Sequence, residues 1–327
     1  MFKSTGVSGF GLAARGLGLL AAGYAMKRFV EARRLHLNGR VVLITGGSRG
    51  LGLLLGREFG RRGGRIAICA RDAAELERAR LNLERRGVEV YASVCDVSDH
   101  AQVERLIKEV EGHYGRLDVL VNNASIMQVG PVEAMKVEDF QHAMAVNFWG
   151  TLHTSLAAID ALKKNEGARI VNICSIGGKV AVPHLLPYDC AKFAVMGLSE
   201  GLRAELAKDD ISVTTVIPGL MRTGSFSSAT FKGDHMGEYL WFSTLAQERA
   251  TSMDGRKAAQ KIVRAAMRRD AEVIIGWQAR LLAFAKAFFP ATVARALSAA
   301  NRAMPKENGF GGEMSGRTLA IDPARFS

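Results

Sequence analysis

Three residues near the middle of the chain have the types and the spacing for proton transfer. Tyr188 follows Ser175 by thirteen residues, and Lys192 comes four residues later. On a helix, residues four apart share a face, so the Tyr188 hydroxyl and the Lys192 ammonium would lie close together. The unperturbed pKa of tyrosine is about 10, and a nearby cation lowers it. Tyr188 can then exchange a proton with a substrate oxygen, although a lone Tyr-x-x-x-Lys usually marks an ordinary surface pair.

A glycine-rich loop offers a second kind of chemistry. Residues 45–52 read TGGSRGLG and lie between an apolar run and a helical stretch. Gly46 permits a tight turn, Gly50 lets the backbone approach a pyrophosphate, and Gly52 allows close contact between helix and sheet. The free N–H groups at the start of the helix attract phosphates. This context predicts a dinucleotide-binding loop made of Gly46, Gly47, Ser48, Arg49, Gly50, Leu51 and Gly52.

Two arginines favour NADP(H) over NAD(H). An acid at the end of the second strand would bind the ribose 2′-hydroxyl of NAD, but this sequence has Arg71 there, followed by Asp72. Arg49 lies in the glycine loop itself. Two guanidinium groups suit a 2′-phosphate, and we expect Asp72 to cap the next helix. NADP(H) is therefore the predicted cofactor, with NAD(H) as the less favoured alternative.

Short apolar runs that alternate with helical stretches must position these residues. Nearly continuous Val, Ile and Leu in each run indicate strands buried on both faces. Ser98 is the expected cap of the helix that ends near Tyr114. The alternation predicts an α/β fold, a Rossmann-type doubly wound parallel sheet in a single domain with N- and C-terminal helical extensions. Strands are predicted at 41–45, 65–70, 88–95, 117–121, 169–174, 211–217 and 272–275, and the longer helices at 72–86, 136–165 and 187–208.

The order of these motifs resembles that of the short-chain dehydrogenase/reductase family. The resemblance covers about residues 38–275. It rests on TGGSRGLG at 45–52, Asp96 in CDV, NNA at 122–124, Asn147, Ser175, YDCAK at 188–192 and PG at 218–219. Two residues depart from the family pattern: Ser125 replaces the glycine usual after NNA, and Cys174 replaces a frequent serine before Ser175. Neither change removes a chemical group that the mechanism needs.

The resemblance implies a role for each matching residue. Tyr188 would be the general acid/base, Ser175 would hydrogen-bond the substrate carbonyl, and Lys192 would bind the nicotinamide ribose and lower the Tyr188 pKa. Asn147 would hold a water that links Lys192 to solvent. Asn122 is expected to tie neighbouring strands together. Besides the glycine loop and Arg71, the implied cofactor contacts are Asp96, Val97, Asn123, Ala124, Tyr188, Lys192, Pro218, Gly219 and Thr223.

These roles predict an NADP(H)-dependent oxidoreductase that interconverts a carbonyl and an alcohol. The alternative is a catalytically silent dinucleotide-binding sensor or scaffold. A lid at about 222–254 is expected to close over the substrate, and its apolar residues fit a lipophilic one, although ordinary packing explains each of them equally well. The family resemblance also implies a homodimer or homotetramer, joined through helices at about 100–114 and 140–165. The apolar lid residues are Phe226, Phe231, Met236, Tyr239, Leu240, Trp241 and Phe242.

The net charge of +12 is concentrated at the two ends of the chain. Residues 1–40 carry seven basic residues and one acid, residues 256–327 carry thirteen and five, and the body between them is nearly neutral. A nucleic-acid enzyme would carry its basic stripe on the working domain, so we expect no nucleic-acid partner. The cysteines lack CxxC spacing and the histidines are scattered, so we predict no metal site. Buried, reduced thiols suit a cytoplasmic protein.

Both basic ends are candidates for contact with the cytoplasmic face of a membrane. In the leader, residues 1–38, positions 7–26 are mostly apolar, but Arg15 disfavours insertion, so an anchor and a surface-lying leader both stay open. The catalytic domain is predicted at 39–275. Residues 276–305 are expected to form basic amphipathic helices that either lie on an anionic membrane or pack on a protein surface. Residues 306–327 are expected to be a flexible tail.

Overall fold

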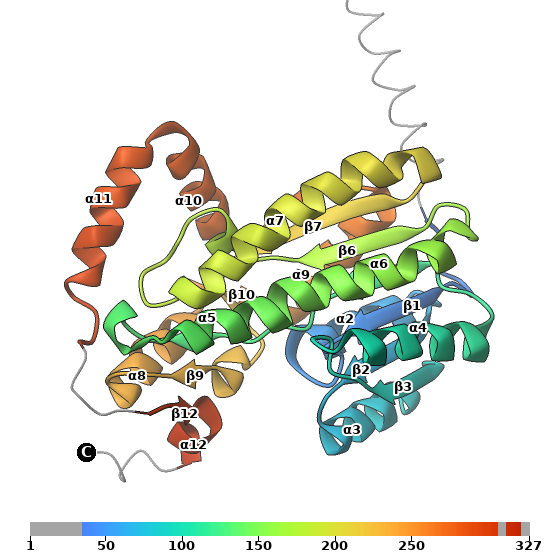
Figure 1. The fold of residues 1–327 in the computed structure, drawn as a ribbon, viewed down its shortest axis with the longest axis horizontal. Coiled ribbons are helices and arrows are strands. Elements are labelled where there is room, and N and C mark those ends of the chain that lie inside the picture. Colours follow the sequence, from blue (N-terminus) through green and yellow to red (C-terminus); the bar gives the residue numbers. More distant parts are fainter. Residues whose placement is uncertain (1–34, 307–311, 322–327) are drawn as a thin grey trace, which may run out of the picture.

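The computed structural model describes residues 35–306 and 312–321. At its centre lies a sheet of seven strands in the order β11-β7-β6-β4-β1-β2-β3 (Figure 1). All neighbouring strands are parallel, and the order reverses at β1, as in a doubly wound Rossmann-type sheet. The predicted fold class is confirmed. The strands are β1 (Val41–Thr45), β2 (Arg65–Ala70), β3 (Val90–Val94), β4 (Val119–Asn122), β6 (Arg169–Ile173), β7 (Ser212–Pro218) and β11 (Glu272–Ile275).

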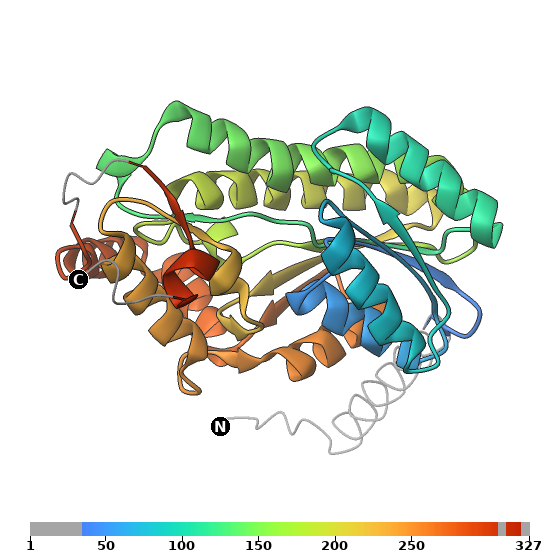
Figure 2. The same ribbon diagram turned by 90° about the horizontal axis from the view of Figure 1, so that it is seen from below.

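Helices cover both faces of this sheet and make three layers (Figure 2). One face packs against α2 (Gly50–Arg61), α3 (Ala73–Glu84) and α9 (Gly255–Arg268). The other packs against α4 (His100–Tyr114), α6 (Gly150–Lys163) and α7 (Leu186–Leu206). All five residues of β1 are buried, which explains its unbroken apolar sequence.

Two helix starts test the expected caps. Asp72 caps α3 as predicted, because its carboxylate accepts a hydrogen bond from the Glu75 amide at 2.9 Å. For α4 the prediction of Ser98 is wrong: the cap is Asp99, which accepts from the Gln102 amide at 3.1 Å. The Ser98 hydroxyl instead donates to the Asp96 carboxylate at 2.7 Å. The two residues are only two positions apart, in the turn that precedes α4.

The expected helix at 136–165 is interrupted in its middle. It consists of α5 (Val137–Ala143), a π-helical turn at Met144–Trp149, and α6. Such π turns inside helices often mark functional sites. This one contains Asn147, whose side chain it directs into the protein interior.

Beyond β7 the chain builds a cap at the carboxyl ends of the strands. The cap contains η5 (Ser225–Ser228), β9 (Thr230–Phe231) and α8 (His235–Gln247), all within the predicted lid at 222–254. Two small sheets complete it: β8 (Met221–Arg222) with β10 (Met253–Asp254), and β5 (Gln128–Val129) with β9 and β12 (Met314–Ser315). Short 3-10 turns lie at Val132–Ala134, Ile176–Gly178 and Ala207–Asp209.

The C-terminal part projects from the body as two helices (Figure 1). These are α10 (Trp277–Phe288) and α11 (Pro290–Asn301), with Pro290 as the first residue of the second helix. Across 35–306 and 312–321, none of the helices combines the length and the apolarity needed to cross a bilayer. The apolar stretch at 7–26 lies outside the described residues.

Residues 312–321 differ from the expectation of a flexible tail. They form β12 and α12 (Gly316–Ile321), which fold back onto the cap. Leu319 is fully buried among Phe231, Phe242 and their neighbours. Leu319, Met314 and the pairing of β12 with β9 attach this segment to the cap, and its composition alone did not reveal this.

Candidate active site

A cavity of about 1120 Å³ opens at the carboxyl ends of the parallel strands. Its walls come from the glycine loop after β1, the ends of β2, β4, β6 and β7, the first turns of α7, and the cap. The residues predicted for catalysis and cofactor binding converge here from separate parts of the chain. All of them line the cavity except Gly47 and Asn147.

The glycine loop forms a cradle with the shape that a dinucleotide requires. Gly46 and Gly50 have φ angles of +62° and +52°, which residues with side chains rarely adopt. A Cβ atom at Gly52 would lie 2.2 Å from the Gly46 carbonyl oxygen, so only glycine lets α2 begin this close to the loop. The N-terminus of α2 thus opens on the cavity and fits a pyrophosphate. Gly47 faces the other way, because a Cβ there would meet Ile68 at 2.5 Å.

Asparagines at the end of β4 support the cradle. The Asn123 side-chain amide donates to the carbonyls of Thr45 and Gly46 at 3.0 and 3.1 Å. The Thr45 hydroxyl accepts from the backbone amides of Asn123 and Ala124. Asn122 lies in the sheet and donates to Asn172 of β6 at 2.9 Å, so its predicted role as a tie between strands is confirmed.

Charges of both signs lie at the end of the cavity beside β2, where the sequence predicts the adenosine part of the cofactor (the adenosine end). Arg71 lies 3.6 Å from Asp96 in an ion pair at the cavity wall. Arg49 binds the Glu75 carboxylate with one nitrogen at 2.9 and 2.8 Å from its two oxygens. The sequence interpretation missed Glu75, which lies three residues after Asp72 and lines the same cavity. Acidic residues are common in the first turn of a helix, where they interact favourably with the helix dipole. The position of Glu75 therefore did not mark it as a residue of the site.

Ser175, Tyr188 and Lys192 meet at the floor of the cavity. Tyr188 and Lys192 share a face of α7, and the ammonium nitrogen lies 5.5 Å from the centre of the phenol ring. The Lys192 ammonium donates to the Ile173 carbonyl at 3.0 Å. Ser175 is in extended conformation after β6, and its hydroxyl oxygen accepts from the Gly177 amide at 3.1 Å. The two hydroxyl side chains and the cation therefore belong to one constellation.

Burial is the main cause of the pKa shifts of Tyr188 and Lys192. It raises the pKa of Tyr188 above its usual value, and the hydrogen bond with Ser175 lowers it by less. Burial also lowers the pKa of Lys192 to about 8. The expected net lowering of the Tyr188 pKa is therefore not found in this structure, because desolvation of the phenolate dominates. Two donor positions of the buried ammonium beyond the Ile173 bond fit the hydroxyls of a ribose.

Asn147 lies beneath the cavity floor and not in its wall. Its side-chain oxygen accepts from the Ile126 amide at 3.0 Å and from the Ser125 hydroxyl at 2.8 Å, and its amide donates to the Ile126 carbonyl. Both polar ends of the side chain are thus used on the segment after β4. Ser125, where the family has glycine, adds one of these bonds.

Gln128 is a second residue that the sequence interpretation missed. Its side chain is almost fully buried and lines the cavity. Its carbonyl oxygen finds no hydrogen-bond partner within the described part of the chain. A buried acceptor without a partner costs free energy, and this one belongs to a residue of the cavity wall. Gln128 lies four residues after Ala124, but no motif in the sequence marks it. Its place in the cavity wall became visible only in the folded structure.

The seven apolar lid residues lie in three different environments. Trp241 and Phe242 line the cavity, together with Leu245 of the same helix. Leu240 is more than half exposed. The remaining four pack inside the cap and do not line the cavity: Phe226, Phe231, Met236 and Tyr239.

Comparison with known proteins identifies the family. A family model described as short chain dehydrogenase matches residues 40–232. The chain belongs to the short-chain dehydrogenase family. Members of this family bind NAD(P)(H) and act on carbonyl or alcohol substrates, so the chain is an NAD(P)-dependent oxidoreductase in this broad sense.

Individual short-chain dehydrogenases agree with this assignment. "Dehydrogenase/reductase SDR family protein 7-like" of Anopheles gambiae is 35% identical over 223 residues, which are 65% of this chain and 68% of the relative. The 3-dehydrosphinganine reductase of Danio rerio is 32% identical over 209 residues, covering 62% and 63% of the two chains. A crystal structure of a short-chain dehydrogenase from Streptomyces avermitilis superposes with a TM-score of 0.69 at 25% identity, covering 81% of this chain and 98% of that one.

Proposed function

We propose that this chain is an NADP(H)-dependent oxidoreductase that interconverts a carbonyl and an alcohol, with Tyr188 as general acid/base. The observation that carries the proposal is the meeting of Ser175, Tyr188 and buried Lys192 at the floor of a cavity whose other end is a phosphate cradle. One end suits a dinucleotide and the other suits proton transfer to oxygen. The catalytic set is Asn147, Ser175, Tyr188 and Lys192.

The chain's residues divide the work of carbonyl reduction. When bound, the nicotinamide supplies the hydride for the carbonyl carbon. Ser175 and Tyr188 hydrogen-bond the carbonyl oxygen, and Tyr188 donates its proton as negative charge develops there. The raised pKa of Tyr188 keeps the phenol protonated at neutral pH, which is the form that reduction uses. Lys192 binds the ribose hydroxyls and stabilises the phenolate that remains.

Asn147 contributes through position. Its side chain holds the segment of Ser125 and Ile126 that forms the cavity wall beside Ala124. The water that we propose between Lys192 and solvent would bind the Asn147 main-chain carbonyl. This carbonyl, at the π-helical turn, accepts a hydrogen bond from the Thr151 hydroxyl at 2.8 Å, and a carbonyl oxygen can accept more than one.

Arg49 and Arg71 support the preference for NADP(H). Both side chains line the adenosine end of the cavity, and each is about half exposed and so able to turn toward a ligand. Guanidinium groups bind phosphate with paired hydrogen bonds. Both are held by carboxylates in the ligand-free protein, and a 2′-phosphate would compete for them.

Apolar side chains around the other end of the cavity support a lipophilic substrate. They come from the loop before α7, from α8 of the cap and from α10. A wall of this kind binds apolar ligands, and a few polar groups set their orientation. The residues are Val182, Leu185, Trp241, Phe242, Leu245 and Leu282.

Helix α10 supports the proposed contact with a membrane. Leu282 lines the cavity, while Leu281, Phe284 and Phe288 are 59%, 57% and 65% exposed. Arg280 and Lys286 lie on the same helix. An exposed apolar face beside basic residues suits an anionic bilayer surface, and a lipophilic substrate would enter the cavity from there. Binding of the full chain to phosphatidylserine vesicles, lost in Phe284→Ser/Phe288→Ser, tests this proposal.

We also propose a homodimer or homotetramer joined through α4 and α6. Trp149 and Leu156 lie on the outer face of this layer and are 48% and 50% exposed. Exposed large apolar side chains of this kind often mark contacts between subunits. Analytical ultracentrifugation of the full chain tests the proposal, and a monomer at micromolar concentration contradicts it.

A catalytically silent dinucleotide sensor is the second candidate function. The complete set of Ser175, Tyr188 and Lys192 disfavours it, because binding alone does not need a phenol beside a buried ammonium. One assay distinguishes the two functions: oxidation of NADPH or NADH by the full chain in the presence of a panel of lipophilic ketones. We expect NADPH oxidation with at least one ketone, and Arg71→Ala should weaken NADPH far more than NADH. Equal weakening contradicts the NADP(H) preference, and binding without turnover favours the sensor.

A further inference from the structure

The C-terminal segment 312–321 is a built part of the cap. Met314 and Ser315 of β12 pair antiparallel with Phe231 and Thr230 of β9 (Figure 1). The Gly316 amide donates to the Ala229 carbonyl at 2.9 Å. A Cβ atom at Gly316 would lie 2.2 Å from the Phe226 carbonyl oxygen, so the backbones are in close contact at this residue. This segment therefore carries its next residue, Arg317, to a fixed place.

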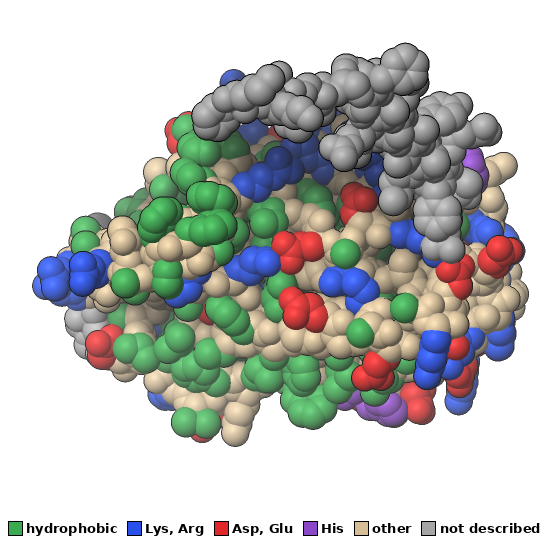
Figure 3. Space-filling model, turned by 90° about the horizontal axis from the view of Figure 1, so that it is seen from above, with side chains coloured by type: hydrophobic (Ala, Val, Ile, Leu, Met, Phe, Trp, Pro, Cys, Tyr) green, Lys and Arg blue, Asp and Glu red, His purple; other side chains and the backbone are tan. Residues whose placement is uncertain are grey.

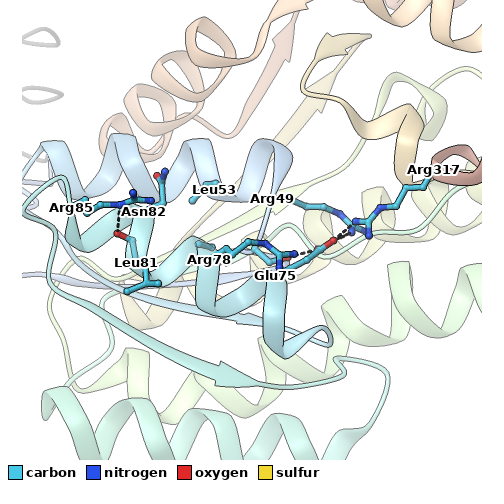
Figure 4. Close-up of a pocket in the computed structure, with 10 residues that line it drawn as sticks. Arg49, Leu53, Glu75, Arg78, Leu81, Asn82, Arg85 and Arg317 are labelled. Atoms are coloured by element: carbon cyan, nitrogen blue, oxygen red, sulfur yellow. Dashed lines mark hydrogen bonds and ion pairs between the residues drawn. The ribbon is translucent and has the colours of Figure 1, made fainter. Parts of the chain in front are cut away.

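Arg317 reaches a carboxylate that is 242 residues away in the sequence. Its guanidinium forms an ion pair with Glu75 of α3, the same carboxylate that Arg49 holds at 2.8 Å (Figure 4). The Glu75 side chain is 9% exposed, whereas both arginines are 51% exposed. Within the described residues, Arg49 and Arg317 are the two cations paired with Glu75.

The two arginines share one oxygen of Glu75, its Oε1, but differ in the cavities that they line. Arg49 and Glu75 line both the large cavity and a neighbouring cavity of about 460 Å³ between α2 and α3. Arg317 lines only the smaller cavity. Arg317 therefore contacts Glu75 without forming part of the wall of the large cavity.

Glu75 is the wrong charge for a 2′-phosphate. Burial would raise its pKa, but hydrogen bonds and charges of Arg317 and Arg49 outweigh burial and hold the pKa below its usual value. The carboxylate is therefore ionised at neutral pH, at the wall where Arg49 and Arg71 would meet the phosphate. If Arg49 were the only partner of Glu75, this carboxylate would compete with the 2′-phosphate for Arg49. Its negative charge would also repel the phosphate.

We propose that Arg317 is a positioning residue for cofactor specificity: it neutralises Glu75 and so leaves Arg49 free to bind the 2′-phosphate of NADP(H). This inference rests on the NADP(H) preference proposed above. The C-terminal segment then contributes to the adenosine end of the site without touching the cofactor. Fixing the charge of Glu75 in advance means that binding needs only the exchange of one Arg49 partner for another.

Binding of nucleotide fragments to the full chain tests this without turnover. Titration calorimetry with adenosine 2′,5′-bisphosphate measures the affinity that includes the 2′-phosphate, and adenosine 5′-monophosphate measures the affinity without it. We expect Arg317→Ala to weaken the bisphosphate about tenfold and the monophosphate little, consistent with the loss of one close charge pair. Arg317→Lys should recover most of the loss. Arg302 is exposed, directly follows α11 and lines neither cavity, so Arg302→Ala removes the same charge and should change neither affinity.

A double substitution tests whether Arg317 acts through Glu75. Glu75→Gln removes the charge that Arg317 is proposed to neutralise, so adding Arg317→Ala to it should cause no further loss of bisphosphate affinity. Equal weakening of both nucleotides by Arg317→Ala, no weakening of either, or a tenfold loss that persists with Glu75→Gln would each overturn the inference. A wild-type chain that binds both nucleotides equally would instead overturn the NADP(H) preference itself.

Figure 3 shows one face of the protein, where basic side chains lie among scattered acids and apolar groups. The charge that Arg317 adds is thus one among many on the surface, and its proposed effect comes from its place beside Glu75. Salt would screen a general surface effect strongly but a half-buried pair less. The affinity difference between wild type and Arg317→Ala should therefore persist at 0.3 M salt, and its disappearance there contradicts the inference.

Discussion

Lys192 lies one turn of α7 beyond Tyr188, with its ammonium nitrogen 5.5 Å from the centre of the phenol ring. The side chain is almost fully buried at the wall of the cavity, and burial lowers its pKa to about 8. A cation held in such a place is costly to the fold. It is therefore expected to serve the reaction and not stability.

Replacement of Lys192 by methionine separates these two effects. Lys192→Met keeps the apolar stem and removes the charge, so we expect turnover to fall by about 10²–10⁴-fold because proton transfer loses its electrostatic support. The free energy of unfolding should stay equal or rise. Urea unfolding and steady-state kinetics measure the two quantities. Lys164→Met, at an exposed lysine, is the control, and a marked loss of stability in Lys192→Met with retained turnover contradicts this account.

Gly52 tests the phosphate cradle. A methyl group there would lie 2.2 Å from the Gly46 carbonyl oxygen and 2.7 Å from the Asn123 amide nitrogen, neither of which can move without distorting the loop. We expect Gly52→Ala to weaken dinucleotide binding at least about tenfold and to destabilise the fold by about 1–3 kcal/mol. Gly112→Ala in α4 has open space and should stabilise by about 0.5–1 kcal/mol. Unchanged binding in Gly52→Ala would exclude the proposed cradle.

Gln128 predicts opposite effects on stability and on substrate binding. Gln128→Leu removes a buried oxygen without a partner among the described residues, so we expect the free protein to gain about 1–3 kcal/mol. A substrate that donates a hydrogen bond at this point should show a higher KM, while NADPH affinity stays unchanged. Thermal unfolding and substrate titration measure the two effects. An unchanged KM across all substrates would show that Gln128 does not contact them.

Asp189 predicts the pH dependence of stability. Burial raises its pKa to about 8, although a hydrogen bond from the Val182 amide opposes the shift. The folded chain therefore keeps a proton that the unfolded chain releases above about pH 3.9. This contribution to stability is complete below pH 3.9 and is lost as the pH rises to about 8.

Asp189→Asn removes this titration. Its unfolding free energy relative to wild type should rise steadily from pH 5 to pH 8 and level off above that. Lys192 titrates in both proteins, so its effect, a gain of stability between about pH 8 and pH 10.4, cancels in the difference. Urea unfolding at five pH values measures the curve, and two parallel curves would contradict the buried neutral carboxyl.

The sequence allowed prediction of the sheet, of the glycine loop and of the catalytic residues in the cavity wall, because these depend on local patterns. Apolar runs located all seven strands to within about two residues, and the glycine loop and Tyr-x-x-x-Lys have fixed spacing. Glu75, Gln128 and Arg317 could not be predicted in the same way. Their roles depend on contacts between distant segments, above all the ion pair between Glu75 and Arg317. The cap of α4 was missed because Ser98 and Asp99 are equally good cap residues by type.

The most direct test of the central claim is NADPH oxidation by Tyr188→Phe with a ketone that the wild-type chain reduces. The substitution removes only the hydroxyl that is proposed to donate the proton. We predict that turnover falls by at least about 10²-fold while NADPH binding, followed by nicotinamide fluorescence, stays within about twofold, well below the tenfold that one good contact contributes. Turnover at the wild-type rate in Tyr188→Phe would contradict the assignment of Tyr188 as the acid.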